Sequence, residues 1–140
     1  NTNFGTVTFN VTDGYQTINP IDVTVTITGN NNTTDYDGAS HTVTGYTAES
    51  SSNLYKVTGN DIDFTFSGNA TATRTDAGTT NMGLAANQFA NTNTNFGTVT
   101  FTVTDGYQTI NKINATVTLH GNNSTLDYDG QPHTDQKSVV

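Results

Sequence analysis

Apolar and polar residues alternate with a period of two along much of the chain. In the segment 21–28, Ile21, Val23, Val25 and Ile27 fall on one side, and aspartate or threonine falls on the other. Because successive side chains of a β-strand point to opposite faces, this alternation predicts a strand with one buried face. Four further segments share the pattern, with apolar positions at Val7, Phe9 and Val11; at Ile62, Phe64 and Phe66; at Val99, Phe101 and Val103; and at Ile113, Ala115, Val117 and Leu119.

Turn-forming residues separate these segments at intervals of roughly ten residues, a spacing typical of a sandwich with about seven strands. The sequence therefore predicts an all-β fold, specifically an immunoglobulin-like antiparallel β-sandwich. A β-grasp-like fold is the alternative, but it requires a full helix, and residues 82–90 fit only one or two helical turns or an edge strand. The Asp-Gly pairs at 13–14 and 105–106 predict two-residue hairpin turns or, alternatively, β-bulges, and both place glycine at positive φ.

An internal repeat divides the chain. Residues 1–42 match residues 93–134 at 32 of 42 positions, an offset of 92 residues. This period exceeds the 20 to 50 residues of solenoid repeats, which indicates separate units in series. The best seams follow Asn19 and Asn111, since each of these residues comes directly after a strand-like YQTI motif. We therefore predict the C-terminal part of a preceding repeat at 1–19, a complete β-sandwich repeat at 20–111 and the N-terminal part of a following repeat at 112–140.

Composition excludes several functional classes. The chain has 12 acidic and 4 basic residues, a net charge of −8 and no cysteine. Without a cationic surface, neither nucleic acid nor an anionic membrane is an expected partner. No apolar run approaches the roughly 18 residues that would insert in a membrane. We expect no enzymatic activity, because there is no cysteine nucleophile, and two of the three histidines, His41 and His133, are one repeat position.

Carboxylates occur in pairs beside a glycine in both copies of the repeat. Asp35 and Asp37 precede Gly38, and Asp127 and Asp129 precede Gly130. The simpler interpretation is an aspartate that caps its own turn. A Ca²⁺ site at Asp35, Asp37, Asp127 and Asp129 is the alternative, although each loop supplies only two carboxylates. We otherwise expect no cofactor.

The tyrosine between the paired carboxylates offers a second candidate site. Tyr36 and Tyr128 occupy this position in the two copies. Each ring either packs over the edge of the sandwich with its hydroxyl in water or stacks on a sugar.

Three motifs follow one another in a fixed order: YDG with HTVTGY, then TDAGTTNMGL, then NFGTVTFTVTDGYQTI. In this order the chain resembles the YDG or MBG (mucus-binding-related) tandem repeats of cell-wall-anchored surface adhesins of Gram-positive bacteria. The resemblance covers residues 21–111 and both part-repeats as far as Thr134. It implies a non-catalytic stalk or spacer repeat of an extracellular adhesin or fibre at the bacterial cell surface, with neighbouring repeats as partners. An adhesive module for mucin or other host glycans is the alternative.

The two part-repeats are complementary in kind, because one ends a repeat and the other begins one. Their apolar strand positions include Phe9, Val11, Val117 and Leu119. We expect these strands either to pair head to tail between molecules or to fray and contact the central repeat only locally.

Overall fold

The computed structural model describes residues 2–134. Residue 1 and residues 135–140, the end of the predicted following part-repeat, lie outside the described residues. The elements are β1 Val23–Gly29, β2 Asn31–Asp35, β3 His41–Thr44, β4 Tyr46–Ser50, β5 Phe64–Phe66, β6 Thr71–Arg74, β7 Gly78–Asn81, the 3-10 helix η1 Ala86–Gln88, β8 Phe89–Asn91, β9 Val99–Thr104 and β10 Tyr107–Asn111. The predicted all-β class is confirmed, whereas the immunoglobulin-like sandwich stays a prediction.

The ten strands form five long runs, each interrupted near its middle. These runs are β1–β2, β3–β4, β5–β6, β7–β8 and β9–β10. Each run pairs antiparallel with the next one. The fifth run pairs parallel with the first, β9 with β1 and β10 with β2, so the order of pairing is closed. This parallel pairing differs from the purely antiparallel arrangement that we expected.

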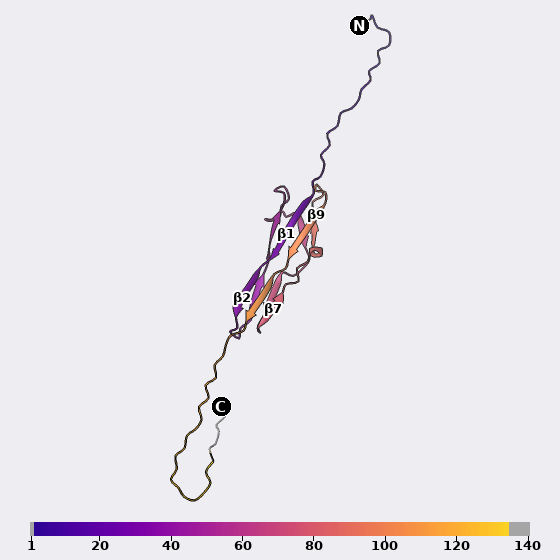
Figure 1. Cartoon of the computed structure of the whole chain (residues 1–140). Helices are drawn as coiled ribbons and strands as arrows, with labels where there is room; N and C mark the ends of the chain where they lie inside the picture. The colour runs from indigo at the N-terminus through magenta and orange to yellow at the C-terminus, as the bar shows by residue number, and fades with distance from the viewer. Residues whose placement is uncertain (1, 135–140) are drawn as a thin grey trace.

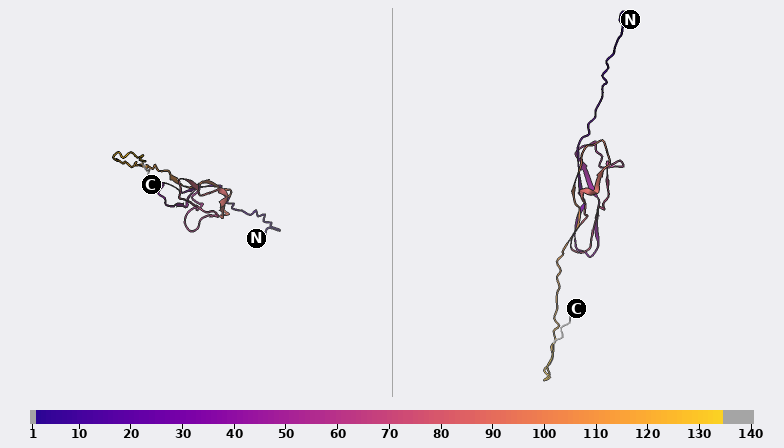
Figure 2. Two further views of the ribbon diagram at one scale, coloured as in Figure 1. Left: turned by 90° about the horizontal axis from the view of Figure 1, so that it is seen from below. Right: turned by 90° about the vertical axis from the view of Figure 1, so that its right-hand side faces the viewer.

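An odd number of alternating runs places the two ends of the unit far apart. The chain enters the unit before β1 and leaves it after β10 at the opposite end (Figure 1). The views in Figure 2 show the same elongated unit between two segments that extend away from it. We call β1, β4, β5, β8 and β9 the entry half, β2, β3, β6, β7 and β10 the exit half, and the level between them the waist.

Strands change partners at the waist. The entry half contains a sheet of order β4-β1-β9 and the pair β5–β8, and the exit half contains a sheet of order β2-β10-β7 and the pair β3–β6. The parallel contact between the first and fifth runs continues on both sides of the waist, over six registered positions in the entry half and five in the exit half. The other pairings each occupy one half only.

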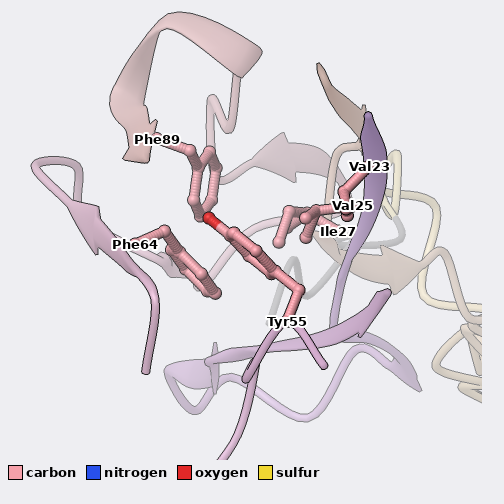
Figure 3. Packing of buried hydrophobic residues seen from close by; sticks show 6 residues of the cluster. All are labelled: Val23, Val25, Ile27, Tyr55, Phe64 and Phe89. Atoms are coloured by element: carbon pink, nitrogen blue, oxygen red, sulfur yellow. The ribbon is translucent and has the colours of Figure 1, made fainter. Parts of the chain in front are cut away.

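The hydrophobic core lies in the entry half. Val23, Val25 and Ile27 are buried and alternate with exposed threonines, which confirms the buried face predicted for segment 21–28. Ile21 is an exception, because it precedes the strand and is exposed. Figure 3 shows these side chains of β1 pointing toward three buried aromatic residues, Tyr55, Phe64 and Phe89.

The exit half has a smaller apolar core. Ala72 and Ile110 are buried there, together with the amide side chain of Gln108. The Gln108 Oε1 atom accepts a hydrogen bond from Asn32 Nδ2 at 3.1 Å. The exit half therefore buries fewer apolar side chains than the entry half.

The part-repeats differ from the strand prediction. Residues 2–22 and 111–134 are exposed, and no strand is assigned to 2–22 or 112–134. The strands predicted at 7–11 and 113–119 are therefore wrong for this chain. Within the complete unit their counterparts pack against the core, with the apolar positions of β1 buried and those of β9 partly buried. An isolated strand lacks such partners for its backbone groups.

Two smaller predictions concern residues 82–90 and the two Asp-Gly pairs. Residues 82–90 contain one 3-10 turn, η1, followed directly by the short strand β8, so both expected conformations occur there. Both readings of the Asp-Gly pairs are wrong, because neither Gly14 nor Gly106 is among the glycines with positive φ, and β9 continues into β10 without reversing. Gly106 instead lies where two backbones meet: a Cβ atom there would overlap the Asn30 carbonyl oxygen.

Candidate functional site

The YDG turn lies at the end of the unit from which the chain leaves. Asp35 is the last residue of β2, and its Oδ1 atom accepts a hydrogen bond from Asn111 Nδ2 at 3.1 Å. The Tyr36 N–H donates to the Asn111 carbonyl oxygen at 3.0 Å. Because Asn111 ends β10, the turn is tied to the last strand residue before the following part-repeat.

Asp37 organises the turn itself. Its Oδ1 atom accepts a hydrogen bond from the Ala39 N–H at 2.9 Å and lies 3.0 Å from His41 Nε2. Gly38 adopts a φ of 80°, a conformation that glycine reaches without strain. The backbone hydrogen bond from Ala39, followed by the one from His41, lowers the pKa of the Asp37 carboxyl below its usual range. Asp37 therefore caps its own turn, as the simpler interpretation of the sequence expects.

The second copy forms the same turn outside any sheet. Asp129 Oδ1 accepts from the Gln131 N–H at 2.9 Å and lies 2.9 Å from His133 Nε2. Gly130 has a φ of 76°. The Gln131 and His133 hydrogen bonds lower the pKa of Asp129 in the same way. Since no strand is assigned to residues 112–134, the local sequence is sufficient for the turn.

The carboxylates predicted as metal ligands have different partners. Asp35 binds an amide of β10, and Asp37 binds its own turn. Within residues 2–134 there is no group of three or more side chains of the metal-ligating types. The predicted sites would offer only Asp35 and Asp37 in one copy and only Asp127 and Asp129 in the other. Ca²⁺ binding stays a prediction.

The two tyrosines predicted to contact glycans lie in different surroundings. Tyr36 is 40% exposed and lines an open depression of about 320 Å³ with Asp76, Ala77, Lys112 and Ile113. Tyr128 is 97% exposed. An exposed aromatic ring therefore lies at the exit end of the complete unit, beside Asp76 of the same unit and Lys112 of the following part-repeat.

Sequence reasoning missed Arg74, the chain's single arginine, which holds the turn that carries Asp76 and Ala77, two of the residues that line this depression. Its guanidinium donates to the carbonyl oxygens of Asp76 at 2.8 Å and Ala77 at 2.9 Å. A third contact reaches the hydroxyl of Thr80 at 3.2 Å. The one signal in the sequence is an arginine directly before the turn-forming TDAG, since the planar guanidinium offers several donors to neighbouring carbonyls.

Removing either histidine of the turns should raise the pKa of the adjacent aspartate. In His41→Ala, the pKa of Asp37 should move toward its ordinary value of 3.8 but stay below it, because the larger cause, the Ala39 hydrogen bond, remains. His133→Ala should act likewise on Asp129. Since both pKa values are lowered, each carboxylate stabilises its turn above pH ~4 and loses this contribution as pH falls through the lowered pKa.

Carboxyl ¹³C chemical shifts followed over an acid titration would measure both pKa values. Unchanged values in both variants would show that the histidines do not contribute.

No helix within residues 2–134 is long and apolar enough to cross a membrane. A comparison of the chain with protein-family models, with curated proteins and with solved structures found no match.

Proposed function

We propose that the chain is a non-catalytic spacer repeat of an extracellular bacterial surface adhesin or fibre. The observation that carries the proposal is the parallel pairing of the first and fifth runs, which sends the chain in at one end of the unit and out at the other. A unit with this path adds its full length to a tandem array. The part-repeats on either side supply the series, because both continue the 92-residue period.

The direction of the strands also suits a role under tension. A force applied to the flanking segments pulls on the start of β1 and the end of β10, along the axis of both parallel pairs. Sliding β9 past β1 and β10 past β2 breaks hydrogen bonds over the whole contact at once. The contact resists this motion on both sides of the waist. By contrast, pulling two neighbouring antiparallel ends apart breaks the hydrogen bonds one after another.

Single-molecule pulling tests this function. The full chain pulled by its two ends should unfold in one high-force event that releases roughly 250 Å of chain, the extended length of the unit less its folded length. The chain has no cysteine, so a single Ser52→Cys handle provides the control. Pulling between this handle and the N-terminus separates β1 from antiparallel β4 and should need a clearly lower force. Equal forces in the two geometries would contradict the spacer function.

One observation favours a second candidate function, the binding of mucin or another host glycan. Tyr36 lies in a depression with Asp76 and Lys112, and such a combination offers a stacking surface beside hydrogen-bonding groups. A glycan array probed with the full chain and with Tyr36→Ala tests it. Binding that depends on Tyr36 would support the adhesive module, and the absence of binding by the unsubstituted chain would count against it.

A further inference from the structure

The boundary between the complete unit and the following copy falls within the depression. Asn111 is fixed to the unit through Asp35 and Tyr36. The next two residues, Lys112 and Ile113, line the depression beside Tyr36. At the 92-residue offset these two residues correspond to Pro20 and Ile21, which begin the complete unit.

The entry end shows how the corresponding residues are held in a folded unit. The Ile21 carbonyl oxygen accepts a hydrogen bond from the Gly97 N–H at 2.9 Å. Asp22 Oδ1 accepts from the Thr98 N–H at 2.6 Å. In the following copy these positions are Ile113 and Asn114, and an asparagine side chain retains an acceptor oxygen for the same contact.

Together, these contacts leave almost no free linker. Asn111 belongs to one unit, and Ile113 belongs to the next by correspondence with Ile21. Only Lys112 is held by neither set of hydrogen bonds, and one residue spans at most about 3.6 Å. Two folded units joined in this way must touch.

Both surfaces that would meet carry exposed apolar side chains. At the exit end this is Tyr36, and Ile113, the counterpart of Ile21 in the following copy, lines the depression with it. At the entry end, Ile21 precedes β1, Leu54 lies in the turn after β4, and Ile62 precedes β5, and all three are exposed. The exit half also has the smaller core of the two halves. Contact with a neighbour would therefore cover apolar surface where the unit itself buries least.

We propose that the depression at Tyr36 is a docking surface for the entry end of the next copy of the same unit, and that successive units form a stiff joint there. The inference rests on the proposed spacer function and specifies its partner. Tyr36 and Ile113 pack together at the joint, and the entry-end residues that correspond to Leu54 and Ile62 close over them. In a stalk built in this way, successive units keep a fixed orientation relative to one another.

Distance measurements between two spin labels test the joint. The chain is extended by one period, so that residues 21–112 occur twice in succession between unchanged flanking segments. Thr26, which is exposed on β1, is replaced by cysteine in both units and labelled. We expect a single narrow distance distribution centred near 50 Å, the length of about 16 extended residues.

Three variants supply the comparison. A four-residue Gly-Ser-Gly-Ser insertion after the first Lys112 should at least double the width of the distance distribution. Tyr36→Ser in the first unit should also broaden it. Tyr36→Ser in the second unit is the matched control: it makes the same change at an end with no complete neighbour and should leave the width unchanged.

The inference is overturned if the distance distribution of the uninterrupted chain is as broad as that of the Gly-Ser variant. It is also overturned if Tyr36→Ser in the first unit leaves the width of the distribution unchanged. A broad distribution with a high unfolding force would remove the joint and leave the spacer function standing. A narrow distribution with equal forces in the two pulling geometries would remove the function and keep the joint.

Discussion

Replacing Gly106 with alanine should destabilise the unit by about 2–3 kcal/mol, at the upper end of the usual cost of adding a buried methyl group. A Cβ atom at Gly106 would overlap the Asn30 carbonyl oxygen and the Met82 sulfur, and backbone atoms at the waist have little room to move. For a unit of this size the melting temperature should fall by roughly 10–20 °C. Thermal unfolding of the full chain followed by circular dichroism measures the change.

Two further variants separate the possible causes. Gly14→Ala makes the same change in the same local sequence, but no atom lies within 4 Å of a Cβ there, so stability should be unchanged. Gly106→Asn tests backbone conformation, because asparagine tolerates positive φ better than most residues. If crowding is the cause, Gly106→Asn should cost at least as much as alanine. If Gly106→Asn lowered the stability clearly less than Gly106→Ala, a positive φ at position 106 would explain the need for glycine.

Gly106 also shows where sequence patterns fail. An Asp-Gly pair between alternating segments is a strong local signal for a hairpin. Here the strand continues, and glycine is needed because the first and fifth runs approach each other at the waist. Gly29 and Gly106 are far apart in the sequence, so no local pattern records that they meet. In contrast, the buried face of β1 was predictable, since alternation within one strand is a local property.

The part-repeats make the same point more sharply. Residues 1–19 and 93–111 are identical at 18 of 19 positions, yet the second copy contains strands and none is assigned to residues 2–19. The single difference, Asn10 against Thr102, falls at an exposed position and does not account for the outcome. Strands 99–104 and 107–111 form because β1, β2 and β7 pair with them. Periodicity identifies a segment that can be a strand, and long-range partners determine whether it becomes one.

The candidate site also combines a local feature that could be predicted from the sequence with a long-range feature that could not. The Asp37 turn was predictable, and its formation in both copies shows that a few adjacent residues define it. The depression was not predictable, because Tyr36, Asp76 and Lys112 come from three separate segments. Head-to-tail pairing of part-repeats between molecules stays a prediction. The joint proposed above differs from it, because complete units meet there end to end without exchanging strands.

Replacing Phe89 with alanine should have the largest effect of any single truncation considered, about 3–5 kcal/mol. Phe89 stacks on Phe66 and Phe101 at centroid distances of 4.8 and 5.7 Å. It also packs edge-on against Tyr46 at 5.4 Å. Aromatic pairs of this kind add to the free energy of burial alone. A loss of this size approaches the whole stability of a small domain.

Urea denaturation of the full chain measures this loss. Phe9→Ala provides the control, because Phe9 is the counterpart of Phe101 in the preceding part-repeat and is 84% exposed. Its midpoint should match that of the unsubstituted chain. A free energy of unfolding for Phe89→Ala within about 1 kcal/mol of that of the unsubstituted chain, below the usual cost of such truncations, would show that the aromatic cluster is not the main core.

Amide hydrogen exchange in the same variant tests how the two halves depend on each other. Phe89 lies in the entry half, but all five runs cross the waist, and the exit half has few buried apolar side chains of its own. We therefore expect the amides of β10 to lose protection together with those of β9, because the exit half cannot retain its strands once the entry core is lost. If the amides of β10 stayed protected while those of β9 exchanged, each half would fold separately. In that case the waist would be a boundary between two small folding units, and glycine at position 106 would separate them rather than join them.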